Sequence, residues 1–132
     1  MAFSEPIVYD PFPRLVGLTI TRRDQECSQC VLEVGDRLMN TNGVVHGGAI
    51  YTLTDVGMGT ALRSHMADDE RCTTLEIKIN YLSAVTSGVL ACKSTLVHRS
   101  RRLAVLESEV TNGGTLVAKA TGTYYISEMK QS

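Results

Sequence analysis

Hydrophobic and polar residues alternate over most of the second half of the chain, which is the pattern of strands that bury one face. In the first of these segments, Leu75, Ile77 and Ile79 would face the core while the polar residues between them face the other way. Turn-forming residues separate four segments, which we predict at 72–83, 88–99, 102–111 and 115–126. Because a parallel pairing needs a long crossover, links this short predict an antiparallel meander.

The first half of the chain predicts two further strands. Residues 14–23 and 26–34 are rich in β-forming side chains and would pair as a hairpin across residues 24–25. Residues 1–13 hold all three prolines of the chain, so we expect an irregular or briefly helical lead-in there.

One long helix has to serve all six strands. It follows a loop at 36–45 and would run from about residue 47 to about residue 66. A curved antiparallel sheet of about six strands wrapped around this helix would bury both elements, which is an α+β fold. Gly57 and Gly59 each cost roughly 1 kcal/mol of helix propensity relative to alanine. We therefore expect backbone to approach backbone at both glycines, although both could simply be packing glycines.

The predicted helix has two apolar faces, and a single acid lies on one of them. At helical spacing the core arc consists of Ala49, Ile50, Leu53, Val56, Gly57, Thr60 and Ala61. Around Asp55, on the other side, lie Tyr51, Met58, Gly59 and Leu62. A solvated face would carry several Lys, Glu or Gln residues. We therefore expect a second copy of the chain to cover the face of Asp55 in a homodimer.

An acid in such surroundings is costly unless it is paired or hydrogen-bonded. Asp55 could hold a backbone group or form a salt bridge between subunits. It could instead act as a general base on water, or attack an acyl carbon directly. Gly47 and Gly48 favour this second hypothesis, because free amides and the helix dipole at a helix start would stabilise an oxyanion.

Length and charge restrict the classes of function. With 132 residues we expect one domain, 1–132, and no room for a DNA-binding domain beside it. Thirteen basic and fourteen acidic residues give a net charge of −1, so no basic field for nucleic acid is expected. The N-terminus does not resemble a signal peptide, and no apolar run reaches the ~18 residues of a membrane span. We expect a cytoplasmic protein with no membrane or nucleic-acid partner.

Cys27 and Cys30 form a Cys-x-x-Cys pair, which has three interpretations. A structural zinc site needs four ligands, and the chain has no second pair of this kind. A redox dithiol would open a helix after a strand, whereas this segment predicts a strand. We interpret both residues, like Cys72 and Cys92, as reduced apolar thiols, and expect no metal.

The segment from Asn40 to Asp55 resembles the hotdog-fold acyl-CoA thioesterases of the PaaI type. It contains an Asn, a Gly-x-x-His-Gly-Gly turn that ends in His46, Gly47 and Gly48, and an acid nine positions after the histidine. The similarity continues through residues 74–82, 98–104 and 116–122, and so spans nearly the whole chain. It implies a hotdog fold and hydrolysis of an acyl-CoA thioester to a free acid and CoA, without a cofactor.

The resemblance implies roles for five residues. Asp55 matches the catalytic acid, as nucleophile or general base, and the Gly47 amide matches the oxyanion donor. Asn40 matches a side chain that contacts the lytic water or the thioester. His46 would orient the loop or contact the thioester, and Thr74 matches a hydroxyl that faces the site across the dimer interface. In this family the acid and the oxyanion donor come from different subunits, and dimers often pair into tetramers.

The resemblance also implies contacts with the rest of the substrate. Gly48 would lie beside it, and the pantetheine path would be lined by Tyr81, Leu82, Ser83 and Ala84. The nucleotide would lie near the densest basic cluster, which consists of Val97, His98, Arg99, Ser100, Arg101 and Arg102. An arginine fork suits phosphate, although such a cluster could equally be a solvated turn. An apolar acyl pocket would involve Tyr51, Met58, Leu62 and Tyr81.

Two other functions stay open at this point. A hotdog dehydratase or hydratase would need a histidine and an acid poised together, whereas His46 and Asp55 on one helix would be ~13 Å apart. A non-catalytic acyl-CoA-binding protein would not need a carboxylate beside the thioester. Release of free thiol, formation of an enoyl product, and binding without turnover distinguish the three functions.

Overall fold

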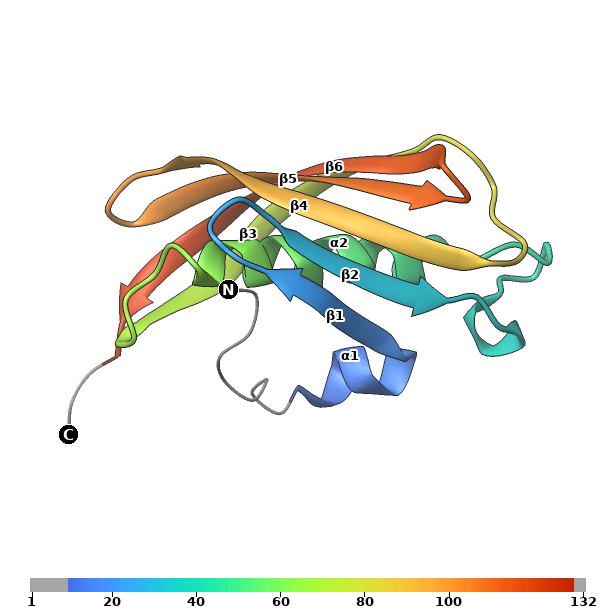
Figure 1. The fold of residues 1–132 in the computed structure, drawn as a ribbon, viewed down its shortest axis with the longest axis horizontal. Coiled ribbons are helices and arrows are strands. Elements are labelled where there is room, and N and C mark those ends of the chain that lie inside the picture. The colour runs from blue at the N-terminus through green and yellow to red at the C-terminus, as the bar shows by residue number, and fades with distance from the viewer. Residues whose placement is uncertain (1–9, 130–132) are drawn as a thin grey trace.

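Six strands form one antiparallel sheet that curves around a long helix (Figure 1). The computed structural model describes residues 10–129. In chain order the elements are α1 (Pro11–Val16), β1 (Leu18–Arg23), β2 (Ser28–Glu33), the 3-10 turn η1 (Asp36–Leu38), α2 (Gly47–Arg63), β3 (Glu70–Tyr81), β4 (Val89–Arg99), β5 (Leu103–Asn112) and β6 (Thr115–Glu128). The predicted α+β architecture is confirmed.

The order of the strands in the sheet is β1-β2-β4-β5-β6-β3. β1 and β2 form the predicted hairpin, and β4, β5 and β6 pair consecutively as predicted. The predicted meander is wrong between its first two strands, because β3 does not pair with β4. β3 pairs with β6, and β4 pairs with β2 and β5. Residues 82–88 form an irregular connection across the end of the sheet, so the turn residues there close no hairpin (Figure 1).

The predicted first strand is wrong at residues 14–16, which belong to helix α1. Pro11 stands at the start of this helix, where its fixed φ suits the first turn. Gly17, at φ 91°, ends the helix in the left-handed conformation that glycine adopts without strain. β1 therefore begins at Leu18. The prediction for residues 1–9 lies outside the described residues.

Helix α2 is buried between two apolar clusters, and it ends at Arg63 rather than at Met66. Its first half packs into a cluster that includes Ile50, Leu53, Leu32 and Leu90. Its second half packs into a cluster that includes Met58, Leu62, Leu106 and Tyr124.

Met58 and Leu62 were expected on the open face beside Asp55, and this expectation is wrong. Both side chains are 0% exposed within one protomer. The helix packs against β3 and β6 as well as β2, β4 and β5. The curved sheet therefore also covers the side of the helix that carries Met58 and Leu62. Of the four residues expected to line an acyl pocket, only Tyr51 and Tyr81 are exposed.

Gly57 is closely packed, but against side chains, and Gly59 is not closely packed. A Cβ atom on Gly57 would lie 2.6 Å from the Ser94 Oγ and 3.2 Å from the Cys92 Sγ. A Cβ atom on Gly59 would meet the Tyr124 ring at 3.9 Å, an ordinary contact. Of the two glycines, only Gly57 therefore stands where a side chain would not fit, and at neither is the nearest group a backbone group.

Buried serines tie the sheet to the middle of α2. The Ser28 hydroxyl donates to the carbonyl oxygen of Gly57 at 2.6 Å, and the Ser108 hydroxyl to that of Thr54 at 3.5 Å. The Ser94 and Ser108 hydroxyls lie 2.6 Å apart. A buried hydroxyl without a partner is costly, so these hydrogen bonds are maintained. They hold the helix turn between Thr54 and Gly57 in position against the sheet.

A β-bulge interrupts β3 at Leu75. Thr74 pairs with Tyr124 and Glu76 with Thr123, so Leu75 is the extra residue on its strand. Leu75 is 56% exposed, which contradicts the prediction that it faces the core with Ile77. The bulge resets the alternation and turns Thr74 toward α2, where its hydroxyl meets Asp55.

Candidate functional site

The carboxylate of Asp55 is half-buried and held by two hydroxyl groups. Its Oδ1 accepts a hydrogen bond from the Thr74 Oγ1 at 2.8 Å and another from the Tyr124 hydroxyl at 2.7 Å. The same hydroxyl lies 3.0 Å from the backbone oxygen of Asp55. Among the described residues no ion pair involves Asp55. Neutral donors of the same protomer therefore stabilise this acid, and a salt bridge within the protomer is not its role.

Tyr124 is the contact that the sequence did not predict. Its side chain is 2% exposed and belongs to the second apolar cluster. Burial, and next the charge of Asp55, raise the pKa of Tyr124 far above its ordinary value, so the hydroxyl stays protonated and donates. The alternation of β6 places Tyr124 on the inner face, but its partner could be found only by knowing that β3 pairs with β6.

The start of α2 leaves one amide open. His46 caps the helix, since its Nδ1 accepts a hydrogen bond from the Gly48 N–H at 2.7 Å. The His46 carbonyl accepts from the Ala49 N–H at 3.0 Å. No residue between 10 and 129 accepts a hydrogen bond from the Gly47 N–H. Of the two predicted glycines, Gly48 is thus engaged in the cap and Gly47 is available as a donor.

Asn40 shapes the loop before the helix. Its Oδ1 accepts from the backbone N–H of Asn42 at 2.8 Å and of Val44 at 3.3 Å. Its own backbone N–H donates to the Val44 carbonyl at 2.8 Å. The Nδ2 group donates to no described residue, so it is the part of Asn40 that could contact a ligand.

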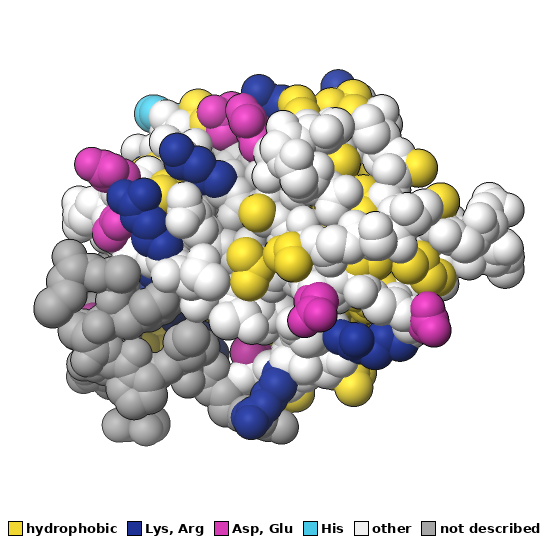
Figure 2. Space-filling view, turned by 45° about the vertical axis from the view of Figure 1, so that its right-hand side comes forward, with side chains coloured by type: hydrophobic (Ala, Val, Ile, Leu, Met, Phe, Trp, Pro, Cys, Tyr) yellow, Lys and Arg dark blue, Asp and Glu magenta, His cyan; other side chains and the backbone are white. Residues whose placement is uncertain are grey.

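A groove of about 400 Å³ opens beside the start of α2. It is lined by Val44, Val45, Gly47, Ile50, Tyr81, Leu82, Ser83, Ala84 and Val85. The structure therefore brings the four residues predicted along pantetheine next to Gly47. The Tyr81 hydroxyl donates to the Gly47 carbonyl at 2.8 Å, and burial raises the pKa of Tyr81. Figure 2 turns this end of the molecule forward and shows hydrophobic side chains exposed over its centre and right.

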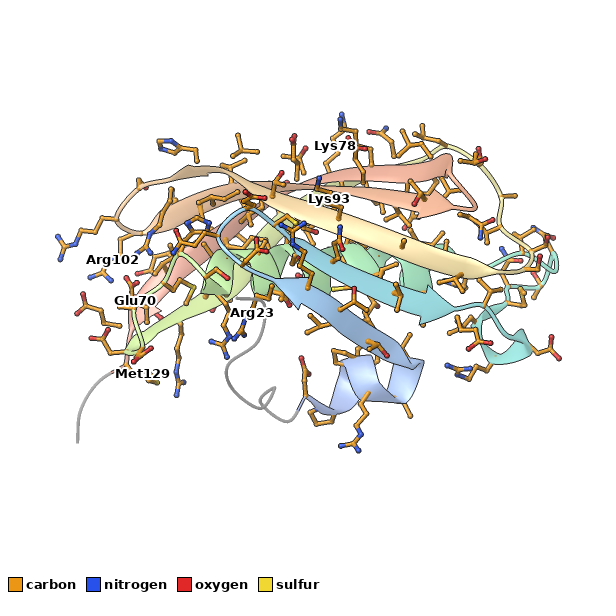
Figure 3. The ribbon with its side chains drawn as sticks, viewed as in Figure 1. Arg23, Glu70, Lys78, Lys93, Arg102 and Met129 are labelled. Carbon is orange, nitrogen blue, oxygen red and sulfur yellow. The ribbon has the colours of Figure 1, made fainter. Side chains whose placement is uncertain are left out.

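The basic cluster at 97–102 lies at the opposite end of α2. It consists of the last three residues of β4 and the turn to β5, and Figure 3 shows Arg102 and Glu70 together at that end. Arg99 donates to Glu70 at 2.7 Å and also to the His65 carbonyl, so it has a structural role. The side chains of Val97, His98, Ser100 and Arg101 are exposed, and that of Arg102 is half-buried. Within one protomer this cluster does not meet the groove.

Gly47 and Asp55 also lie apart within one protomer. Both belong to α2, eight residues from each other, which corresponds to ~12 Å along a helix at 1.5 Å per residue. A reacting carbonyl group needs its nucleophile and its oxyanion donor each about 3 Å away. A single protomer therefore holds the acid and the amide but does not bring them together.

The cysteines take no part in these contacts. All four thiols are free, and Cys27 and Cys30 are buried. Burial, with a smaller effect of Cys92, raises the pKa of Cys30 to about 12, which suits an inert apolar thiol. In the described part of the chain, no three His, Cys, Asp or Glu side chains are grouped so as to hold a metal ion. Over the same residues, no helix combines the length and apolar character needed to cross a membrane.

The chain is similar to known proteins in both sequence and structure. Residues 42–119, more than half of the chain, match the family profile described as the thioesterase superfamily. The conserved protein PA5202 from Pseudomonas aeruginosa is 38% identical, with a TM-score of 0.88 over 92% of this chain and 100% of its own. A mutant form of the phenylacetic acid degradation protein PaaI from Thermus thermophilus is 26% identical, with a TM-score of 0.82 over 88% and 98%. The thioesterase HI1161 from Haemophilus influenzae, 20% identical over 90% and 84%, has a TM-score of 0.86 and shares the fold.

Proposed function

Since the chain belongs to the thioesterase superfamily and has its hotdog fold, we propose that it hydrolyses an acyl-CoA thioester to a free acid and CoA. The observation that supports this proposal best is the state of Asp55. A half-buried carboxylate that accepts from two hydroxyl groups, and that forms no ion pair with residues 10–129, suits a general base or a nucleophile. A purely structural acid would be expected to satisfy a backbone amide or an ion pair.

The proposed site contains Asp55 of one protomer and Gly47 of a second. Because the two residues are ~12 Å apart on one helix, an antiparallel pair of α2 helices is the simplest way to place them around one acyl carbon. Asp55 either takes a proton from water, whose oxygen adds to the carbon, or adds to the carbon itself. The carbonyl oxygen then becomes an oxyanion that accepts a hydrogen bond from the Gly47 amide. The carbon–sulfur bond breaks as the carbonyl re-forms, and CoA leaves as a thiolate. In the first route the thiolate takes up the proton that Asp55 removed from water, and the free acid forms directly. In the second route a mixed anhydride of the acyl group and Asp55 forms; water hydrolyses it to the free acid and the regenerated carboxylate, and the thiolate takes up a proton from that water.

The remaining predicted residues fit this two-protomer site. The groove lined by Tyr81, Leu82 and Ser83 leads to Gly47 and would hold pantetheine. A basic turn at the far end of α2 would approach that groove only from the second protomer, with Arg101 and Arg102 as its phosphate contacts. We include homodimers, and pairs of such dimers, in the proposal.

We also propose a reducing compartment such as the cytoplasm. Cys30 and Cys92 are partners in the register of β2 and β4, yet both thiols are free. No cofactor enters the proposed reaction, because every proposed step uses side chains and amides of the chain itself.

Release of free thiol from a panel of aliphatic and aryl acyl-CoAs tests the activity and ranks the acyl groups by kcat/KM. Replacement of Asp55 by asparagine keeps the shape and removes the base, so kcat should fall by about 10²–10⁴-fold, the usual contribution of a positioned acid or base. The control is Asp68→Asn, since Asp68 is exposed in the loop after α2. Hydrolysis in labelled-oxygen water under single-turnover conditions then distinguishes base from nucleophile.

Two results would contradict the proposal. Formation of an enoyl product without thiol release would assign a dehydratase, and tight binding without turnover by the unmutated chain would assign a sensor. The first would also require a free histidine beside the acid, whereas the His46 Nδ1 already caps α2.

A further inference from the structure

We propose that Tyr124 is a positioning residue that determines which oxygen of Asp55 reacts. The inference rests on the proposed thioester hydrolysis and adds to it a residue, an atom and an orientation. Tyr124 would act through Asp55 and would not touch the substrate.

The two oxygens of Asp55 have different surroundings. Oδ1 accepts from both Thr74 and Tyr124, at 2.8 and 2.7 Å, which uses its two lone-pair directions. Oδ2 accepts from no described residue, and no side-chain oxygen that is fully buried lacks a partner among residues 10–129. Oδ2 therefore reaches the surface of the protomer. An oxygen that already accepts two hydrogen bonds is the poorer base and nucleophile, so Oδ2 is the reacting atom.

Tyr124 is the firmer of the two donors. Its side chain is 2% exposed, belongs to the same apolar cluster as Met58 and lies beside Gly59. Its hydroxyl lies between two oxygens of the same residue, at 2.7 Å from Oδ1 and 3.0 Å from the backbone oxygen of Asp55. Thr74, by contrast, comes from an edge strand next to a bulge.

The backbone under Asp55 is fixed from the opposite side. Ser108 binds the carbonyl of Thr54, and Ser28 binds that of Gly57, so the helix turn that carries Asp55 is held at both its ends. With the backbone fixed by serines and Oδ1 fixed by Tyr124, few rotamers of Asp55 keep both contacts. The free oxygen then has a set direction, which is what a near-attack geometry requires.

Tyr124→Phe removes the hydroxyl and keeps the buried ring. We expect kcat to fall by about 10- to 100-fold, the scale of one hydrogen bond to a charged group, with KM changed less than about twofold because the substrate is not touched. A fall in kcat with an almost unchanged KM is the mark of a residue that acts on the reacting carboxylate and not on substrate binding.

Tyr125→Phe is the matched control. Tyr125 is the next residue of β6, points to the other face and is 41% exposed, so loss of its hydroxyl should change neither kcat nor KM. Thermal unfolding of both variants shows how much of the protein is folded at the assay temperature. A merely structural role of Tyr124 would lower the melting temperature and leave kcat per folded protein unchanged.

An unchanged kcat in folded Tyr124→Phe would overturn the inference. If that variant does not fold, Thr74→Val decides in its place, since loss of the other donor to Oδ1 must lower kcat while KM changes less than about twofold. An unchanged kcat in folded Thr74→Val overturns the inference too. Failure of the proposed function looks different, because the unmutated chain would then release no thiol from any acyl-CoA.

Discussion

The start and the middle of α2 differ in how completely one protomer builds them. In the middle, Asp55 already has two hydroxyl donors, and serines bind the helix on both sides of it. At the start, the Gly47 amide has no acceptor among the described residues, and Gly47 lines a groove of about 400 Å³. One protomer thus supplies the hydrogen-bond donors of the carboxylate, whereas the amide at the start of α2 is open to a ligand.

The difference follows from when each group carries charge. A carboxylate is charged in the free protein, so its partial burial has to be compensated by donors at all times. An amide N–H at a helix start is neutral and can remain in water until an oxyanion forms. The acid therefore needs hydrogen-bond donors that are present in the free protein, whereas the oxyanion donor needs only to be accessible to the substrate. Substitutions that change either the start or the middle of α2 test this difference.

Gly47→Pro should have the largest effect among these changes, because it removes the open N–H of the proposed oxyanion donor. Proline suits the first position of a helix, and His46 already has φ −61° and ψ 135°, the extended conformation that precedes proline. Loss of one oxyanion donor should lower kcat by about 10²–10³-fold. Steady-state kinetics on the best acyl-CoA of the panel measure it.

Gly47→Ala is the control for that variant. A Cβ atom at this position would lie 3.0 Å from the Tyr81 ring, so both variants bring a Cβ atom against Tyr81. Only the proline removes the N–H, and kcat should therefore separate the two. Equal losses in both would mean that the groove, and not the amide, was damaged.

A mixture of Asp55→Asn and Gly47→Pro chains tests whether the two ends meet across protomers. Each variant alone should be nearly inactive. Random pairing of equal amounts in a two-fold symmetric dimer gives one intact site in each mixed dimer, or about a quarter of the unmutated activity. Thiol release after joint refolding measures this recovery. No recovery above the parent variants would mean that Gly47 and Asp55 do not form a shared site.

The sequence predicted the elements better than it predicted their neighbours. Alternation identifies six strands and one long helix, because burial of one face leaves its period in the chain. It fails at Leu75, since a bulge depends on how β3 pairs with β6 and leaves no mark in β3 alone. It also fails at Met58 and Leu62, because a helical wheel does not contain the curvature of the sheet around the helix.

In the candidate site, too, the sequence predicted single residues better than the contacts between them. Asp55 stands out as one acid among apolar residues, and Gly47 stands out by its place at a helix start. Tyr124 was missed, because it lies 69 residues from Asp55 and on a strand whose neighbour was predicted wrongly. With β3 placed beside β4, nothing connects Tyr124 to Thr74. A correct strand order would have revealed the contact.

Glu70→Gln should have the smallest effect on activity and a clear effect on stability, because Glu70 lies at the far end of α2. Hydrogen bonds from the Ala67 N–H, and next from Arg99, hold the pKa of Glu70 below its ordinary value. A folded pKa below the unfolded value of about 4.3 gives stability that is complete above that pH and is lost as pH falls through the folded pKa. Between about pH 6 and pH 3, Glu70→Gln should therefore lose less stability to urea than the unmutated chain does. An equal dependence of stability on pH in the two proteins would contradict the assignment.

At neutral pH kcat of Glu70→Gln should stay within about twofold, since Glu70 touches neither Gly47 nor Asp55. A large fall in kcat would break the comparison, because it would show that the end of α2 is coupled to the carboxylate in its middle.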